Sequence, residues 1–337
     1  MKAVVLEAQD ALTVKDVPDA TAAKGKALIR VSGTGICATD VKILTGGIPV
    51  TYPLIMGHEI VGELIDGGGK NGAKPGDPVL VDPVLTCGKC YYCQHGQANL
   101  CPVGGLIGRD QDGGFAEYVS VPSSNVYPLP DSIDLTAAPM IQVLTTCHHA
   151  HERAAIQPGE AAVITGLGVT GQMNIQLAKA AGASPVIGIS RTASKRDLAL
   201  ELGADIVASH GEEALKVTRE ATDGRGADVI IESVGALAVL GETMDLARIG
   251  GRIVPFGIYT GTQAEMPFYQ FYFKELSILN ARAAFARDFP ASIDLVASGK
   301  VRLEPLLSHA LPIERADEAI HMLMEPGSDR MKVVLTY

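Results

Sequence analysis

The segment from Ala161 to Ser190 constrains the fold more than any other part of the chain: AAVITGLGVTGQMNIQLAKAAGASPVIGIS. Its apolar start predicts a buried strand ending at Thr165, and its alanine-rich middle predicts a helix ending near Gly182, a residue type favoured just after a helix. The last residues, PVIGIS, predict a second strand. A strand, a G-x-G-x-x-G turn, a helix and another strand in this order predict a dinucleotide-binding βαβ unit.

The three glycines of this turn have separate physical roles. Gly166 permits the tight turn, Gly168 lets the backbone approach a pyrophosphate at the helix N-terminus, and Gly171 allows close packing of helix against strand. The later stretches ADIVAS, GADVIIESVG and GGRIVPFGI each predict a strand that ends in a turn, which indicates a parallel sheet with covered faces. The residues predicted to bind the cofactor are Gly166, Gly168, Val169, Gly171, Ser190, Arg191, Lys195, Arg196, Ser233 and Gly257.

The end of the second strand indicates which dinucleotide is preferred. Folds that prefer NAD place Asp or Glu here to bind the ribose 2′-hydroxyl. This chain has Ser190 followed by Arg191. A guanidinium in place of a carboxylate suits a 2′-phosphate, so we expect NADP(H) to be preferred over NAD(H). Lys195 and Arg196 follow closely, and a second interpretation of these two residues is an exposed helix start.

Four of the six cysteines lie within CGKCYYCQHGQANLC, residues 87–101. The spacing C-x2-C-x2-C-x7-C suits tetrahedral coordination of zinc by thiolates. An iron–sulfur cluster also uses four cysteines, and a disulfide framework would need an oxidising compartment, of which the sequence gives no sign. Four thiolates leave no position for a substrate, so we expect a structural zinc. Its predicted ligands are Cys87, Cys90, Cys93 and Cys101.

Length, charge and hydropathy limit the remaining possibilities. The 337 residues suffice for two domains of ordinary size. The formal net charge of −10 argues against a nucleic-acid partner, because phosphates would repel it. No apolar run reaches the roughly 18 residues that a membrane span requires. The start, MKAVVLEAQD, lacks the long apolar centre of an export signal, so we expect a cytoplasmic protein.

Two further stretches, GTGICATDVKI and YPLIMGHEIVGEL, contain metal-binding residue types. The first holds Cys37, Thr39 and Asp40, and the second holds His58 and Glu59. Taken alone, Cys37 would be a buried small residue and His58 a hydrogen-bonded loop histidine. Their presence beside a cysteine cluster and a dinucleotide unit favours a second metal site.

In these features the chain resembles the zinc-dependent medium-chain alcohol dehydrogenase family. The resemblance extends over nearly the whole length, and the motifs occur in the family's order. They are G-x-C-x-T-D at Gly35 to Asp40, GHE at Gly57 to Glu59, the four-cysteine lobe, DGGFAEY at Asp112 to Tyr118, the GLGVTG turn, and ASGKVRLEPLLSH at Ala297 to His309.

The resemblance implies an α/β protein with two domains. Residues 1–145 and 287–337 would form a β-rich catalytic domain similar to chaperonin-10 (GroES), with the structural zinc lobe at about residues 86–103. Residues 146–286 would form the Rossmann domain that binds NADP(H). The active site would lie in the cleft between the two domains.

The resemblance also implies roles for individual residues. Cys37 and His58 would be ligands of a catalytic zinc, and Glu59 would lie beside the metal or exchange onto it. Asp40 would orient the imidazole, and Thr39 would pass the substrate proton onward. Zinc would make the proton of an alcohol easier to lose, and hydride would move between the substrate carbon and the nicotinamide.

Two positions depart from the family pattern. The third protein ligand is usually Cys, Asp or Glu, whereas this chain has Gln142, a neutral amide and a poor zinc ligand. Either Glu59 coordinates directly, or Gln142 binds weakly, or metal occupancy is low. Lys42 stands where many relatives have the histidine that ends a proton relay.

We therefore expect a zinc-dependent oxidoreductase that transfers hydride between NADP(H) and a secondary alcohol, polyol or related ketone. We expect no nucleic-acid or membrane partner, and, as in relatives, a homodimer or homotetramer. Two alternatives stay open. One is a metal-independent, NADPH-dependent reductase of activated double bonds, which Gln142 would permit. The other is a non-catalytic zinc-containing binding protein.

Overall fold

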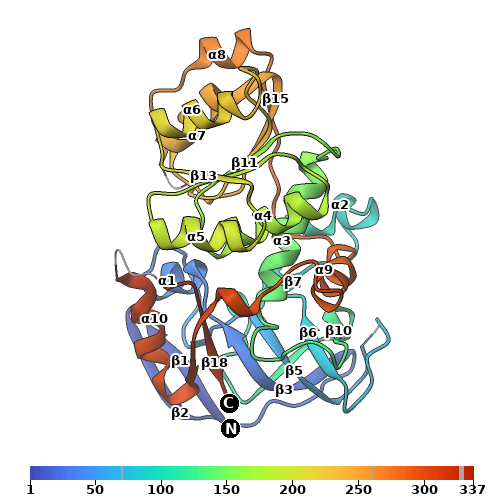
Figure 1. The fold of residues 1–337 in the computed structure, drawn as a ribbon. Coiled ribbons are helices and arrows are strands. Elements are labelled where there is room, and N and C mark those ends of the chain that lie inside the picture. The colour runs from blue at the N-terminus through green and yellow to red at the C-terminus, as the bar shows by residue number, and fades with distance from the viewer. Residues whose placement is uncertain (70, 260, 326–329) are drawn as a thin grey trace. The chain divides into compact units, whose positions relative to one another are not determined.

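The structure is a computed structural model that describes residues 1–69, 71–259, 261–325 and 330–337. The chain divides into two compact units. Unit 1 comprises Met1–Thr145, Phe285–Gly299 and Leu303–Tyr337, and unit 2 comprises Thr146–Ala284 and Lys300–Arg302. Both chain termini lie in unit 1, next to each other (Figure 1).

Unit 2 is built on a six-stranded parallel sheet. Numbered within the unit, the strand order is 3-2-1-4-5-6, which is typical of dinucleotide-binding sheets. The predicted βαβ unit and the three later strands are thus confirmed, and the order reverses between the first and fourth strands. From edge to edge the strands are β13 (Ile206–Ala208), β12 (Val186–Ile189), β11 (Ala162–Thr165), β14 (Ala227–Glu232), β15 (Ala247–Pro255) and β16 (Ser277–Ile278).

Helices cover both faces of this sheet. Side chains alternate along a strand, so Ile164 of β11 packs in one apolar cluster with α4 and α5, and Val163 packs in another with α6 and α7. Both faces are therefore apolar and buried, as a parallel sheet requires. The helices are α3 (Met140–Ala154), which begins in unit 1, α4 (Val169–Ala180), α5 (Ala193–Glu201), α6 (Glu212–Glu220), α7 (Leu237–Leu246) and α8 (Phe268–Phe273).

Unit 1 is rich in β-structure. Its largest sheet has seven strands in the order β10-β6-β5-β3-β18-β17, with β9 paired to β3. Two smaller sheets have the orders β2-β1-β4 and β7-β8. The strands are β1 (Lys2–Ala8), β2 (Ala11–Asp16), β3 (Lys26–Gly35), β4 (Leu54–Ile55), β5 (Glu59–Asp66), β6 (Pro78–Val81), β7 (Val84–Leu85), β8 (Gly105–Leu106), β9 (Tyr118–Pro122), β10 (Val126–Pro128), β17 (Leu307–Pro312) and β18 (Lys332–Thr336).

The C-terminal segment completes the seven-stranded sheet. Strand β18 pairs in parallel with β17 and antiparallel with β3, where Val334 lies opposite Gly35. On the other side of β3, strand β5 places Glu59 opposite the same Gly35. Side chains of β5 and of the C-terminal strand β18 can therefore meet across β3.

The helices of unit 1 are short. Helices α1 and α10 pack in one apolar cluster with β1 and β18. Within the described ranges, no helix has both the length and the apolar composition needed to cross a membrane. The helical segments are α1 (Ala38–Leu44), α2 (Tyr91–Gln94), η1 (Ala98–Leu100), η2 (Ser123–Asn125), α9 (Asp288–Ala297), η3 (Glu304–Leu306), η4 (Ile313–Arg315) and α10 (Ala316–Met324).

Candidate active site and dinucleotide site

Cys37 is the N-cap residue of helix α1. Its Sγ accepts a hydrogen bond from the Thr39 amide at 3.5 Å, and its own amide donates to Asp40 Oδ2 at 2.8 Å. These two bonds form a capping box in which a thiol takes the place of the usual hydroxyl. The capping box thus fixes the position of the sulfur, and a cysteine sulfur binds metals as the thiolate.

His58 follows a turn that favours glycine. Gly57 has a φ of 93°, and a Cβ at this position would lie 2.5 Å from a ring carbon of Phe115. The Nδ1 atom of the buried His58 is 3.3 Å from Asp40 Oδ1, although neither atom has an aligned hydrogen bond. With Nδ1 turned to Asp40, Nε2 is the nitrogen left for a metal. Burial lowers the pKa of His58, but the nearby charge of Asp40 and the polar contacts with Asp40 and Cys37 raise it well above its usual value.

Glu59 begins strand β5 and is fully buried. Its Oε1 accepts a hydrogen bond from Lys332 Nζ at 2.6 Å, and its Oε2 lies 2.5 Å from the same nitrogen without an aligned hydrogen bond. Lys332 is only 5% exposed, so this ion pair lies in the interior of unit 1. Each of the two charges stabilises the other there, because burying an unpaired charge has a large unfavourable free energy.

Cys37, His58 and Glu59, here called the Cys37 cluster, form a donor set that suits zinc. One sulfur, one ring nitrogen and one carboxylate oxygen lie within 4.8 Å of one another. These are the protein ligands that zinc prefers, and three of them leave a fourth position for substrate, as in catalytic zinc sites. The buried Oε2 of Glu59 makes no aligned hydrogen bond, although Lys332 Nζ lies 2.5 Å from it. The residues present therefore fit a catalytic zinc.

Three other residues are candidates for this site. Two follow Cys37 closely in the sequence, and the third is assigned to the site by the family resemblance. Thr39 is half-buried in α1, and its amide contacts the Cys37 sulfur. Lys42 is half-buried in the last turn of the same helix. Gln142 is buried at the start of α3, where its backbone carbonyl accepts a hydrogen bond from Thr145 Oγ1 at 2.6 Å. A ligand role for Gln142 stays a prediction.

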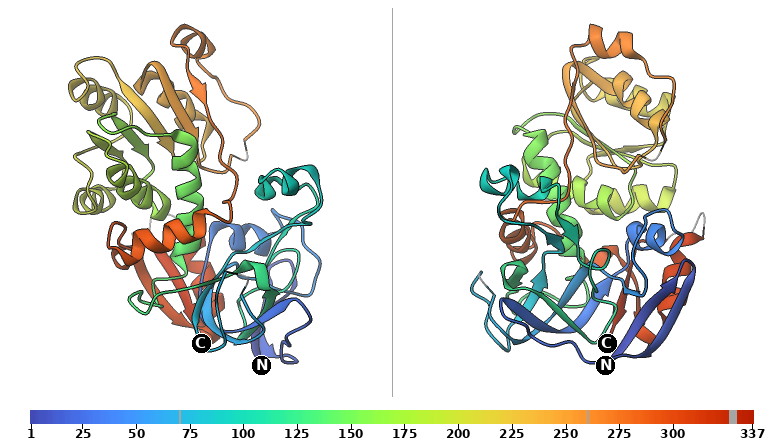
Figure 2. Two further views of the ribbon diagram at one scale, coloured as in Figure 1. Left: turned by 90° about the vertical axis from the view of Figure 1, so that its right-hand side faces the viewer. Right: turned by 180° about the vertical axis from the view of Figure 1, so that it is seen from behind.

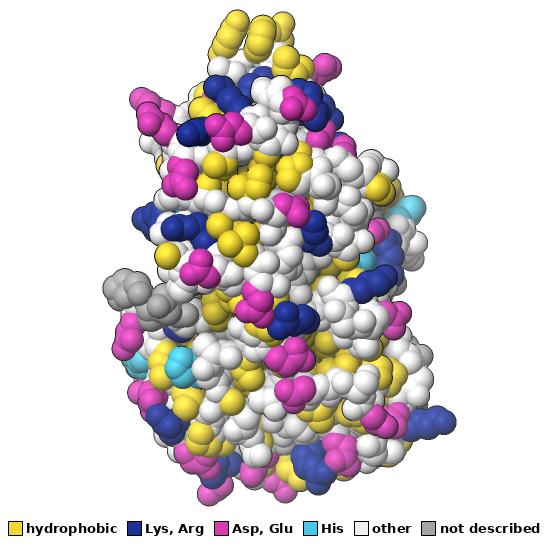
Figure 3. Space-filling view, viewed as in Figure 1, with side chains coloured by type: hydrophobic (Ala, Val, Ile, Leu, Met, Phe, Trp, Pro, Cys, Tyr) yellow, Lys and Arg dark blue, Asp and Glu magenta, His cyan; other side chains and the backbone are white. Residues whose placement is uncertain are grey.

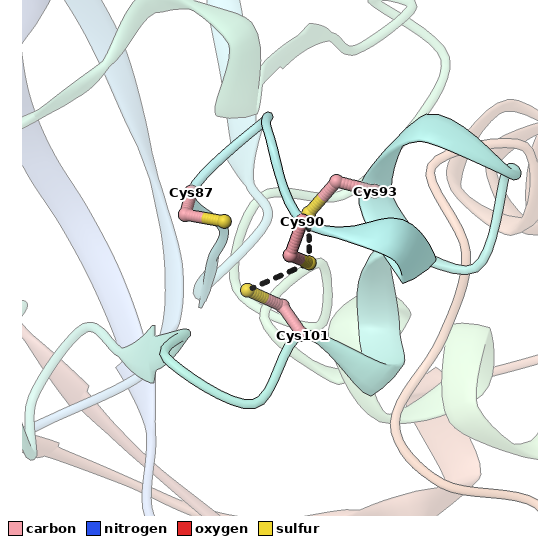
Figure 4. A group of neighbouring side chains, drawn as sticks. All are labelled: Cys87, Cys90, Cys93 and Cys101. Carbon is pink, nitrogen blue, oxygen red and sulfur yellow. Dashed lines mark hydrogen bonds between the residues drawn. The ribbon is translucent and has the colours of Figure 1, made fainter.

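The four cysteines of the lobe converge as a tetrathiolate site requires (Figure 4). Cys90 Sγ lies 3.5 Å from Cys93 Sγ and 3.8 Å from Cys101 Sγ, close to the spacing of about 3.8 Å between sulfurs bound tetrahedrally to one zinc. All four are free thiols. Backbone amides of Lys89 and Cys90 lower the pKa of Cys87 to about 6, which favours its thiolate. Figure 2 shows the lobe, with α2, standing out from the sheets of unit 1.

The glycine-rich turn of unit 2 has the geometry that its sequence predicts. Gly166 has a φ of 82°, in the left-handed region. A Cβ on Gly171 would lie 1.9 Å from the Gly166 carbonyl oxygen, so helix α4 can approach β11 only without a side chain here. A Cβ on Gly168 would meet nothing within 4 Å. The space over Gly168, at the N-terminus of α4, is therefore open to a phosphate group.

A cavity of about 530 Å³ opens beside this turn, and ligand sites in proteins typically have volumes of about 300–1,000 Å³. Gln172 fixes its wall, because its amide donates to Leu167 O at 3.3 Å and to Lys195 O at 2.7 Å. Six of the predicted cofactor residues line the cavity: Gly166, Gly168, Ser190, Arg191, Lys195 and Ser233.

The other four predicted cofactor residues act behind the cavity wall. Arg196 donates from Nη1 to Ser190 O at 2.7 Å and to Arg191 O at 3.1 Å, so its guanidinium supports the strand end rather than lining the cavity. Val169 and Gly171 belong to α4. A Cβ on Gly257 would lie 2.2 Å from the Gly235 amide nitrogen, so Gly257 permits two loops to approach closely.

Sequence reasoning missed two residues of the cavity, His210 and Glu242, and the lysine that pairs with Glu59, Lys332. His210 and Glu242 line the cavity, with 3.6 Å between Nδ1 and Oε2. His210 directly follows the predicted strand ADIVAS, and ligands bind at the carboxyl edge of a parallel sheet. The sequence therefore contained enough information to propose His210 as a cavity residue. The sequence gives no such indication for Glu242 and Lys332, because their positions depend on the rotation of a helix and on the register of a strand.

Comparisons with known proteins agree with this geometry. Residues 23–131 match the alcohol dehydrogenase GroES-like domain, and residues 169–298 match the zinc-binding dehydrogenase family. The sorbitol dehydrogenase of Halalkalibacterium halodurans is 33% identical over 327 residues, which cover 96% of this chain and 95% of that protein. The chain belongs to the zinc-dependent medium-chain alcohol dehydrogenase family. It is thus an oxidoreductase that acts on alcohols.

Other members of the zinc-dependent alcohol dehydrogenase family are similar over the whole length. The L-galactonate-5-dehydrogenase of Escherichia coli is 34% identical, and the match covers 93% of this chain and 92% of that protein. A solved zinc-binding dehydrogenase of Sinorhizobium meliloti, bound to NADP, is 31% identical with a TM-score of 0.92, covering 100% of this chain and 99% of that one. The expected fold class, a Rossmann domain with a GroES-like domain, is confirmed.

The four-cysteine lobe of this alcohol dehydrogenase provides a first test. Cys93→Ser is expected to remove one zinc per chain and to expose residues 87–101 to limited proteolysis. A metal whose free concentration is about 1,000 times its dissociation constant stabilises the folded lobe by about 4 kcal/mol, and the variant loses this stabilisation. Cys147→Ala is the matched control, since Cys147 is a buried thiol in helix α3 of unit 2. Unchanged zinc content in Cys93→Ser would show that the lobe does not hold zinc.

Proposed function

We propose that this enzyme transfers hydride between NADP(H) and a secondary alcohol, polyol or related ketone, with a catalytic zinc at the Cys37 cluster and a structural zinc in the lobe. The observation that carries the proposal is the convergence of a thiol, an imidazole and a carboxylate within 4.8 Å. It is supported by the separate cavity beside the glycine-rich turn, which has the chemistry of a dinucleotide site.

In this proposal the bound zinc supplies Lewis acidity toward the substrate oxygen. Cys37 and His58 hold the metal, and Asp40 keeps the imidazole oriented through Nδ1. Glu59 supplies the third ligand atom, since the neutral Gln142 is a weak one. Thr39 passes the substrate proton onward, and the glycine-rich turn fixes the dinucleotide by its phosphates.

The preference for NADP(H) rests on the wall of the cavity. Arg191 follows the end of β12, where NAD-preferring folds have a carboxylate, and Lys195 of α5 adds a second cationic side chain to the cavity wall. One carboxylate, Glu242, also lines the cavity, but it faces His210. Among solved relatives, the Sinorhizobium meliloti protein is bound to NADP, and an Escherichia coli alcohol dehydrogenase with 29% identity and a TM-score of 0.92 is complexed with NADH.

The relatives and the Cys37 cluster together support the proposed substrate class. The similar proteins include dehydrogenases named for sorbitol, L-galactonate and D-arabitol phosphate. A metal-independent reductase of activated double bonds is the second candidate, favoured by Gln142 in place of an anionic ligand. The intact Cys37 cluster favours the zinc enzyme.

A substrate and cofactor panel tests the proposal. Zinc-replete enzyme is expected to oxidise secondary alcohols or polyols with NADP⁺ at a higher kcat/KM than with NAD⁺, and to lose this activity when a chelator removes the metal at the Cys37 cluster. Activated enones with NADPH form the comparison set. Reduction of enones that persists after chelation, without alcohol oxidation before it, would establish the second candidate instead.

We also propose that the enzyme is a homodimer or homotetramer. Helix α8 supports this, because it carries aromatic side chains that are at least 60% exposed and form an apolar patch on the surface of unit 2 (Figure 3). Large exposed apolar patches are typical of protein–protein contacts. The side chains are Phe268, Tyr269, Tyr272 and Phe273.

A further inference from the structure

A buried polar contact links helix α4 to the wall of the dinucleotide cavity. Asn174 lies in the middle of α4 and is fully buried. Its Nδ2 donates a hydrogen bond to Ser233 Oγ at 3.2 Å. Ser233 directly follows β14 and is one of the residues that line the cavity, whereas Asn174 lies behind the cavity wall. Asn174 can therefore act on a bound dinucleotide only through Ser233.

Asn174 also makes a polar contact with His151 of helix α3. Both ring nitrogens of His151 are buried, and within the described residues neither has an aligned hydrogen bond. The same holds for Asn174 Oδ1. Burial lowers the pKa of His151 to about 3, and the contact with Asn174 offsets this only in part. The imidazole is therefore neutral near neutral pH and carries a single N–H.

The donors and acceptors of these side chains complement one another. Because Nδ2 of Asn174 is bonded to Ser233, the amide group that still needs a partner is the acceptor Oδ1. The single N–H of the neutral His151 ring is the matching donor, and leaving both groups unpaired in the interior would be unfavourable. This pairing allows the amide one orientation, with its nitrogen toward Ser233.

The orientation of the amide determines where the Ser233 hydroxyl points its hydrogen. A hydroxyl has one hydrogen to donate, and its oxygen can accept at the same time. Since the Ser233 oxygen accepts from Asn174, its hydrogen is directed away from Asn174 and can be donated into the cavity. Gly168, which leaves open space for a phosphate, lines the same cavity. A hydroxyl donor here suits the oxygens in the ribose–phosphate part of a dinucleotide.

We propose that Asn174 and His151 are positioning residues of the dinucleotide site, which direct the Ser233 hydroxyl as a donor toward a ribose or phosphate oxygen of the cofactor. This inference rests on the proposed function, since it requires a dinucleotide in the cavity. It assigns cofactor affinity to two buried side chains outside the glycine-rich turn. None of the three residues belongs to the Cys37 cluster, so they act on cofactor binding and not on the zinc.

The test is the dissociation constant of NADPH, measured by the fluorescence of the reduced nicotinamide, with kcat and thermal stability measured on the same preparations. Ser233→Ala and Asn174→Leu are each expected to raise this constant about tenfold, through the loss of one oriented hydrogen bond to the cofactor. The kcat at saturating cofactor is expected not to fall. His151→Phe, which keeps the bulk but has no N–H, is expected to weaken binding by less, because Asn174 remains beside Ser233.

Two further arms separate this role from a structural one. Gln176 is another buried amide of α4, but it bonds the backbone oxygen and nitrogen of Arg302, at 3.1 and 2.7 Å. Gln176→Leu is therefore expected to lower thermal stability and to leave the dissociation constant of NADPH unaltered. The double variant Asn174→Leu/Ser233→Ala is expected to bind NADPH no more weakly than Ser233→Ala, because Asn174 acts through Ser233. If Asn174→Leu does not fold, Asn174→Ala is judged by the same criteria.

The outcomes distinguish this inference from the proposed function. All variants are measured with NADH as well, because both dinucleotides share the ribose–phosphate part. If the unaltered enzyme binds neither NADPH nor NADH, the dinucleotide site itself is wrong. If it binds one of them and Asn174→Leu binds it as tightly as Gln176→Leu does, only the positioning role is overturned. Fully additive losses in the double variant would also overturn it, and an unaltered dissociation constant in His151→Phe would overturn the part assigned to His151.

Discussion

Cys37→Ser and His58→Ala are each expected to lower kcat/KM for alcohol oxidation by about 1,000-fold or more. Each substitution removes one donor from a set of three, and the cluster then cannot hold zinc firmly. A bound metal ion stabilises the charge of the transition state by several kcal/mol, and each 1.36 kcal/mol is a factor of ten in rate. Steady-state kinetics and zinc content, measured on the same preparations, check the prediction.

Matched variants distinguish the loss of the metal from a general destabilisation of the folded enzyme. Cys147→Ala removes a buried thiol of unit 2, and His95→Ala removes an exposed imidazole beside α2. Both are expected to keep two zinc ions per chain and an unaltered kcat/KM. A fully active Cys37→Ser enzyme without metal at the cluster would contradict the zinc mechanism, although the family assignment would stand.

The fold could be predicted from the sequence where local signals agree. In the segment from β11 to β12 the apolar runs, the three glycines and Gly182 all point to one structure, and Gly182 has the left-handed φ of 83° that such a position favours. The alternation of strands and helices likewise predicts the parallel sheet of unit 2, although it does not fix the order of the six strands. The β-rich unit 1 was expected only through the family resemblance.

The site was only partly predictable, because its contacts join distant segments. Cys37 and Asp40 are the N-cap and N3 residues of one capping box, so their spacing of three residues in the sequence is enough to predict that they lie close together. The Glu59–Lys332 pair spans 273 positions and depends on the registers of β5 and β18 on β3. Nothing in the residues around Lys332 indicates that register. Likewise, Arg196 cannot be told from Arg191 by residue type, yet only Arg191 lines the cavity.

Arg191→Glu is expected to reduce the preference for NADP⁺ over NAD⁺ by about 100-fold. Arg191 lines the cavity at the end of β12, and within the described residues its guanidinium has no ion-pair partner. A hydrogen bond to a charged group contributes about 1.5–3 kcal/mol. The substitution removes this contact to a 2′-phosphate and adds a like charge, whereas it offers a carboxylate to the 2′-hydroxyl of NAD⁺. The ratio of kcat/KM values for the two cofactors measures the change.

The charge reversal must act at the cavity and not through the net charge of the enzyme. Lys216→Glu changes the net charge by the same amount on the exposed face of α6 and is expected to leave the cofactor ratio unaltered. Lys195→Gln, which removes the second cation of the cavity wall, is expected to shift the ratio in the same direction as Arg191→Glu but by less, because no new repulsion is added. A cofactor ratio in Arg191→Glu equal to that of Lys216→Glu would show that the strand end does not select the 2′-phosphate, and NAD(H) would then be as good a candidate as NADP(H).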